Sequence, residues 1–134
     1  MAIADTTEND LIKAIAYGDA VPAWNASLYI SLHSANPGET GDQDTSEATY
    51  TSYDRVAVLR DMTGWTVTAN QAVTVDPVIF PQCTGGGPED LTHFAVGTDA
   101  TGPGQIIFYG PLPTPKTIDT DDIPEFASVT MYFD

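Results

Sequence analysis

The sequence contains few basic residues. Only four lysines and arginines stand against nineteen aspartates and glutamates, so the formal net charge of the 134-residue chain is −15. A nucleic-acid-binding protein neutralises a row of phosphates with basic side chains, and an anionic membrane attracts a polybasic segment. The four bases, Lys13, Arg55, Arg60 and Lys116, are too few and too scattered for either task. We therefore expect neither nucleic acid nor a membrane as a partner.

Cysteine, histidine and long apolar segments are also scarce. Cys83 is the single cysteine, so no disulfide can form within the chain, and His33 and His93 lie too far apart in sequence to suggest a zinc site. No apolar run approaches the roughly 18 residues of a membrane span. The first ten residues, MAIADTTEND, are acidic where a signal peptide would be basic. This predicts synthesis in the cytoplasm without a cleaved signal.

Turn-forming residues are abundant, with ten prolines and eleven glycines. Between them lie about eight short segments with the alternating pattern of half-buried strands, a pattern typical of a sandwich or jelly roll. The expected strands are residues 28–33, 55–60, 65–70, 73–75 together with 78–80, 92–97, 105–110, 116–118 and 126–133. We predict an all-β protein: an antiparallel β sandwich, jelly-roll-like, formed by residues 21–134 as a single domain.

A short helix or arm is expected before this domain, within residues 1–20. Residues 7–10 (TEND) suit a helix N-terminus with acids in the first turn, and Gly18 suits its end. Leu11, Ile12 and Ile15 follow at helical spacing. A helix of about three turns is marginal alone, so it needs contacts with the rest of the chain or with a partner.

The last expected strand contains an apolar row. Val129, Met131 and Phe133 alternate with polar or aromatic residues, so they are expected to face the core while the strand pairs within a sheet. We therefore expect removal of the last five residues to cost much of the stability.

Acidic residues cluster in residues 39–47, in the 89–90 turn and in residues 119–125, outside the expected strands. The first cluster lies in a polar stretch, residues 34–52, that is long for a loop without structure and therefore a candidate functional segment. Carboxylates in a flexible loop can bind Ca²⁺, but the spacing matches no helix–loop–helix calcium site. We favour solvated acidic loops over a calcium site.

No set of residues has the pattern of a catalytic or cofactor site. His33 and His93 lie on expected strands, where a hydrogen-bonded surface or edge position is the simpler interpretation. Cys83 has no basic neighbour in sequence to activate it and is expected to be a small buried hydrophobe. The glycine run 85–87 precedes Pro88-Glu89-Asp90 where a phosphate loop would place a lysine and a helix. We predict no catalytic, cofactor-binding or metal-binding residues and no enzymatic activity.

Carbohydrate binding is the alternative from another functional class. Aromatic rings can stack on sugars, although rings in β sandwiches mostly fill cores or interfaces. The rings that could be presented in this way are Trp24, Tyr50, Tyr53, Trp65 and Tyr109.

An ordered series of motifs resembles small virion proteins of tailed bacteriophages. Residues 28–38, LYISLHSANPG, are similar to the opening strand and turn of that family, and YDRVAV at 53–58 is similar to its next strand after an acidic loop. Further similarities follow as GWTVT, IFPQCTGG, THFAVG and YGPL, at residues 64–68, 79–86, 92–97 and 109–112. The resemblance covers residue 28 to the C-terminus and implies a structural virion component without chemistry.

Members of this family are capsid decoration (cement) proteins or tail-fibre-like proteins. Because packaged DNA is a polyanion, a protein of charge −15 is expected outside the capsid, and the sequence contains no repeating shaft. We expect an outer capsid decoration protein that bridges and stabilises capsomers. Its partners would be the major capsid protein and copies of itself, as a homo-oligomer on the capsid surface. The alternative within this class is a tail or head fibre module that contacts the host.

In this setting the N-terminal helix would act as an arm against the shell or a sister copy. Arg55 and Arg60 are weak candidates for contact residues, because in so acidic a chain each is expected to find an internal carboxylate.

Overall fold

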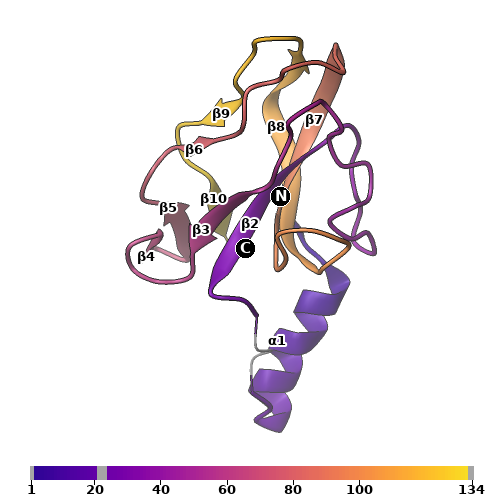
Figure 1. The fold of residues 1–134 in the computed structure, drawn as a ribbon. Coiled ribbons are helices and arrows are strands. Elements are labelled where there is room, and N and C mark those ends of the chain that lie inside the picture. The colour runs from indigo at the N-terminus through magenta and orange to yellow at the C-terminus, as the bar shows by residue number, and fades with distance from the viewer. Residues whose placement is uncertain (1, 21–23, 133–134) are drawn as a thin grey trace.

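The computed structural model describes residues 2–20 and 24–132. It contains one helix and ten strands, which form a β body with the helix projecting from one end (Figure 1). The elements are β1 (Ala2–Ile3), α1 (Asp5–Tyr17), β2 (Ser27–His33), β3 (Val56–Leu59), β4 (Trp65–Thr68), β5 (Gln71–Thr74), β6 (Val78–Ile79), β7 (Glu89–Gly97), β8 (Ile106–Ile118), β9 (Glu125–Phe126) and β10 (Thr130–Tyr132). The prediction of an antiparallel all-β sandwich with a short N-terminal helix is confirmed.

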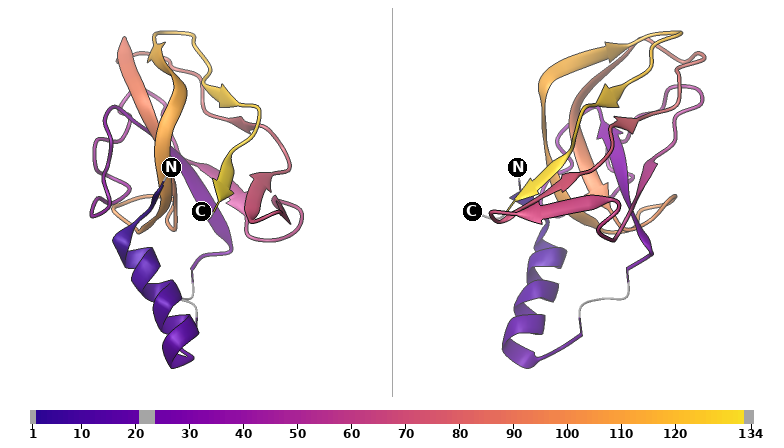
Figure 2. Two further views of the ribbon diagram at one scale, coloured as in Figure 1. Left: turned by 180° about the vertical axis from the view of Figure 1, so that it is seen from behind. Right: turned by 90° about the vertical axis from the view of Figure 1, so that its left-hand side faces the viewer.

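The main layer is a five-stranded antiparallel sheet in the order β1-β8-β7-β2-β3. The opposing layer consists of two smaller antiparallel sheets, β10-β5-β4 and β6-β9 (Figure 2). Residues from both layers form the main core, among them Ile30, Phe94 and Val96 from the large sheet and Trp65 and Val78 from the small ones. The apolar residues thus lie between the layers, as a sandwich requires.

A smaller apolar cluster lies on the other face of the large sheet. It joins Ala4, Ala95, Ile106 and Tyr109, next to the point where the chain enters α1. β1 pairs with β8 here, Ala2 opposite Tyr109 and Ile3 opposite Phe108. Ala2 and Ile3 therefore form an edge strand of the large sheet, and α1 starts from a fixed position.

Helix α1 begins earlier than predicted. Its N-cap is Ala4, which makes no side-chain cap bond, and Thr7 lies inside the helix. The expected cap at residues 7–10 is therefore wrong, because the pairing of β1 with β8 sets where the helix starts. Its end is as predicted: Gly18 adopts φ +70°, and the Asp19 N–H donates to the Lys13 carbonyl at 3.4 Å, the pattern of a glycine C-cap.

Several expected strands differ in extent. The two expected at 105–110 and 116–118 form one long strand, β8, which continues through three prolines because its pairing with β7 is irregular between Leu91 and His93. The strand expected at 126–133 is divided into β9 and β10. Glu89 and Asp90, expected in a turn, begin β7. These differences arise from pairing with distant strands, which local sequence does not report.

β10 pairs with β5, Met131 opposite Ala72, and Val129 is buried beside it. Met131 packs against the main core, so the expected inward row is confirmed at Val129 and Met131. The expected position of Phe133 lies outside the described residues.

Candidate functional site

The stretch 34–52 is packed against the sheet rather than extended into solvent. His33 forms an isolated antiparallel bridge with Glu47, and the Ala48 N–H donates to the Leu32 carbonyl at 2.8 Å. Ala48 and Tyr50 belong to the main core. Residues 47–50 therefore continue the sheet beside the end of β2 and contribute side chains to the main core.

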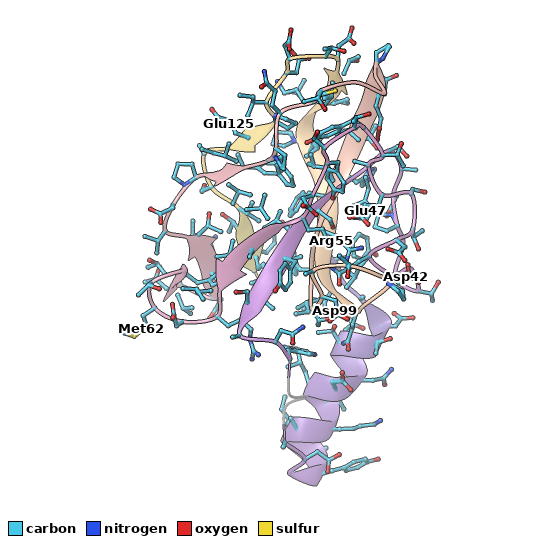
Figure 3. All side chains as sticks on the ribbon, in the orientation of Figure 1. Asp42, Glu47, Arg55, Met62, Asp99 and Glu125 are labelled. Atoms are coloured by element: carbon cyan, nitrogen blue, oxygen red, sulfur yellow. The ribbon has the colours of Figure 1, made fainter. Side chains whose placement is uncertain are left out.

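The buried side chain of Arg55 bonds to this segment and to a distant turn. Its guanidinium donates to both carboxylate oxygens of Glu47 at 2.7 Å, to Asp44 Oδ1 at 2.9 Å, and to the carbonyls of Asp99 at 2.9 Å and Gly102 at 2.8 Å. Figure 3 shows Glu47 and Asp99 on either side of it. Only 3% of the side chain is exposed. Arg55 thus finds internal carboxylates, as expected, and it joins the loop to the turn after β7.

Gln43 contributes to the same connection. It is fully buried; its side-chain amide donates to the Asp99 carbonyl at 3.1 Å, and its Oε1 accepts from the Asp99 N–H at 2.9 Å. No sequence pattern identified this residue, because a single glutamine in a polar loop resembles a surface residue. The Arg55–Gln43 network is a structural anchor and leaves no open polar site.

Arg60 behaves differently. It donates to the carbonyls of Trp24 at 2.9 Å and Asn25 at 3.0 Å, and its guanidinium lies 5.4 Å from the centroid of the Trp24 ring. The expectation of a carboxylate partner is not met among the described residues. Arg60 thus holds Trp24 and Asn25 in the segment that precedes β2, and a cation–π contact takes the place of the expected ion pair.

The two histidines are neighbours across the sheet, since His33 pairs with His93. His33 is fully buried, not at the surface: its Nδ1 lies 2.8 Å from the Thr45 carbonyl and its Nε2 lies 2.8 Å from Ser31 Oγ. A carbonyl can only accept, so Nδ1 carries the proton and Nε2 faces the serine hydroxyl. Burial lowers the pKa of His33 below its ordinary value. Ser31 and His33 are both fully buried, so this serine–histidine pair has no access to a substrate.

The other candidate groups are also packed. Cys83 is a free, fully buried thiol. In the glycine run, Gly86 has φ +74°, and a Cβ on Gly87 would lie 2.7 Å from the Ile118 carbonyl. These glycines therefore allow close packing. The part of the chain that the structure describes holds no group of three or more His, Cys, Asp or Glu that could bind a metal.

Most of the aromatic rings considered for sugar binding are in the interior. Tyr50, Trp65 and Tyr109 are buried, and Tyr53 stacks on Phe80 with 6.3 Å between centroids. Trp24 lies under Arg60. The rings thus form the core and its margins, and they build no open aromatic platform over the described residues.

A groove of about 630 Å³ lies between β8 and the segment around β9. Its floor is apolar, with Leu91, Leu112 and Phe126, and Lys116 and Glu125 are among its polar lining. Glu125 is labelled in Figure 3 on this side of the molecule. The lining thus combines a floor of core residues with charged and hydroxyl side chains.

The clearest unpaired surface is on α1. Its first half is tied to the sheet, whereas Ile12, Ile15 and Tyr17 are 61%, 85% and 76% exposed. The end of the helix stands clear of the β body in every view (Figures 1 and 2). No helix among the described residues is long and apolar enough to cross a membrane. The molecule thus presents an apolar helix end and a packed body without an open catalytic arrangement among the residues described.

A family model described as podophage GP4 fiber I protein gp80 matches residues 2–133, almost the whole chain. The chain belongs to this family. It is thus a bacteriophage structural protein of the virion and fibre class, in agreement with the structural virion component that the sequence resemblance implied. A search of curated proteins found no match.

Proposed function

We propose that this protein is a fibre module on the outside of a podophage particle, with a structural and not a catalytic role. The observation that carries the proposal is the family match across residues 2–133, which spans both α1 and the β body. The structure supports it, since Cys83, His33 and the glycines at 85–87, which could suggest chemistry, are used in packing. The net charge of −15 is compatible with an external position, away from packaged DNA.

The experiment is quantitative mass spectrometry of purified virions, combined with gold labelling of a tagged chain. A fibre module is expected at a small number of copies per particle, with label at the tail. Absence of the chain from purified virions would contradict any virion role.

A decoration protein on the outer capsid surface is the second candidate. The favouring observation is the small, single β body without a repeated shaft among its described elements, a size that suits a clamp between capsomers. The partners would then be the major capsid protein and further copies of this chain, with many weak contacts repeated by symmetry.

The same measurements separate the two candidates. Decoration predicts hundreds of copies with label over the head. It also predicts that particles lacking the chain open at lower temperature or under milder osmotic shock, because a protein that binds only the intact shell stabilises it. Equal resistance with and without the chain would contradict decoration and leave the fibre role.

A further inference from the structure

Helix α1 is anchored at one end only. The Thr7 hydroxyl donates to the Ile106 carbonyl at 3.0 Å, and the Gln105 amide donates to Thr7 Oγ1 at 2.8 Å and to Asp10 Oδ2 at 3.2 Å. The Asp5 N–H donates to the Glu39 carbonyl at 3.1 Å. These bonds hold the first two turns on the sheet, so the helix projects in a defined direction (Figure 2).

The projecting half is almost free of charge. Residues 11–17, LIKAIAY, contain one charged side chain, Lys13. Leu11 and Ala14 are half-buried on the side toward the sheet, whereas Ile12 and Ile15 are exposed. Residues three apart lie on one face of a helix, so the two isoleucines form an apolar ridge that points away from the protein's own core.

Acids precede this ridge along the same face. Asp5, Glu8, Ile12 and Ile15 follow one another at spacings of three and four residues within α1. Such spacing places these four residues in one stripe on the helix. The stripe is acidic at its start and apolar toward the C-terminal end of the helix.

A second copy of this chain is a poor occupant for the stripe. Two helices side by side in parallel would bring Glu8 against Glu8 and Asp5 against Asp5. An antiparallel pair that brings Ile12 to Ile15 would bring Glu8 of one copy to the C-terminal end of the other helix, where the last carbonyls carry partial negative charge. Each copy also carries a net charge of −15, so the like charges repel in either arrangement.

We propose that the Asp5–Glu8–Ile12–Ile15 stripe of α1 docks in an apolar groove with a basic rim on a different protein of the virion. The isoleucines enter the groove, as in other helix-in-groove contacts, and Asp5 and Glu8 face lysines or arginines beside it. Copies of this chain then meet, where they meet at all, through other surfaces. The inference rests on the proposed virion role and assigns the surface that attaches the protein.

The test uses phage that encode substituted chains and measures copies per purified virion relative to the major capsid protein. The variant I12S/I15S is expected to fall to roughly a tenth of the wild-type copy number or less, because each buried isoleucine contributes enough for about a tenfold change in affinity. The matched control is I79S/I123S, which removes two other exposed isoleucines and should leave the copy number unchanged. The single variant I15S is included in case the double variant folds poorly, and the circular dichroism and melting temperature of each purified chain are compared with wild type.

Charge is tested with D5N/E8Q against D54N/E125Q, which neutralises two exposed acids outside the stripe. D5N/E8Q chains are expected to leave the virion at lower NaCl concentration than wild type, and the control chains to leave with the wild type. An unchanged copy number for folded I12S/I15S and I15S would overturn the inference. So would sedimentation showing that the purified wild-type chain forms an oligomer that I12S/I15S dissociates, since the helix would then meet a second copy. Absence of the wild-type chain from virions would instead contradict the proposed function.

Discussion

At the scale of single residues, Arg55 makes the largest number of side-chain hydrogen bonds among the described residues. Its guanidinium makes bonds to two carboxylates and two carbonyls while almost wholly buried. Replacing one partner of a buried ion pair leaves the other charge uncompensated, which costs about 3–5 kcal/mol. R55A is therefore expected to lower the free energy of unfolding by about 3 kcal/mol or more, measured by urea denaturation.

Arg60 provides the control, because it is exposed and bonds to carbonyls and a ring. R60A is expected to cost about 1 kcal/mol, the size of one exposed cation–π contact with its hydrogen bonds. Equal costs for the two variants would show that the network around Glu47 does not depend on Arg55.

His33 makes the stability depend on pH. Burial lowers its pKa below the ordinary value of 6.5, with the Thr45 carbonyl, Glu47, Arg55 and His93 as the facing groups. The unfolded chain therefore binds the proton more readily, and linkage makes stability rise with pH in this window. The contribution of neutral His33 is complete above pH 6.5 and is lost as the pH falls from there toward the lowered pKa of the folded state.

The variant H33N isolates this effect from the titration of the acids. At pH 7.5 it is expected to cost about 1–3 kcal/mol through lost hydrogen bonds, and the cost should shrink toward pH 5, because only the wild type loses stability there. H93N should show a weaker pH dependence, since His93 is half-exposed. A cost for H33N that grows toward pH 5 would contradict the lowered pKa.

At the scale of elements, β10 completes a sheet that is otherwise a bare hairpin. Without β10 only β4 and β5 remain paired in that sheet, and a two-stranded hairpin is marginal in water. Removing residues 130–134 is expected to lower the free energy of unfolding by several kcal/mol, about as much as losing one large buried side chain together with its strand pairing. The midpoint of urea unfolding measures this loss.

Two methionine substitutions test whether β10 stabilises the protein through its inward side chain and not only through the length of paired chain. Met131 packs against the core, whereas Met62 in the β3–β4 turn is 90% exposed (Figure 3). M131A is expected to cost about 2 kcal/mol and M62A less than about 0.5 kcal/mol. Similar values for both would mean that β10 does not contribute through its inward side chain.

Local pattern predicted the strands that have one clear inward face. Leu28, Ile30 and Leu32 alternate in the sequence and are all buried in β2. The same pattern placed Ser31 and His33 toward solvent, yet both are buried: the His33 ring bonds to the Thr45 carbonyl of the 34–52 segment and to Ser31 Oγ. That segment has no periodicity, and its anchors are Arg55, Gln43 and contacts with the distant turn around Asp99. Side chains whose burial depends on such long-range packing cannot be located by periodicity.

Helix α1 likewise shows what local sequence pattern can and cannot predict. Helical spacing in residues 11–15 correctly predicted a helix that ends at Gly18. Spacing alone left open whether Ile12 and Ile15 face the protein's own sheet or a partner. In the structure, Thr7, Asp10 and Leu11 occupy the side of the helix that faces the sheet. Ile12 and Ile15 are exposed to solvent. The candidate attachment surface could be seen only once the inward face was known.

At the scale of the whole molecule, the charge of −15 acts against the compact fold. Acids repel one another across the surface, and salt weakens this repulsion, since the screening length falls from about 30 Å at 0.01 M to about 8 Å at 0.15 M ionic strength. Raising NaCl over this range is therefore expected to raise the melting temperature by a few degrees, the shift that about 1 kcal/mol produces in a domain of this size. The buried Arg55–Glu47 pair does not offset this gain, because buried pairs are screened much less.

Calcium chloride at equal ionic strength separates general screening from a specific site. The acids of residues 39–47 and 119–125 mostly bond to neighbouring backbone groups or to Arg55: Asp42 accepts from the Asp44 N–H, and Asp122 accepts from the Asp119 N–H. Carboxylates engaged in this way are already held in turn geometry, so Ca²⁺ must displace these bonds to bind. We therefore expect NaCl and CaCl₂ to give the same melting temperature within about 1 °C. A specifically bound ion at a hundredfold excess over its Kd would instead add about 2.7 kcal/mol to the free energy of unfolding and raise the melting temperature further in CaCl₂. A saturable additional rise with CaCl₂ would show that one of the acidic turns binds calcium and that the charge is partly balanced by a bound ion.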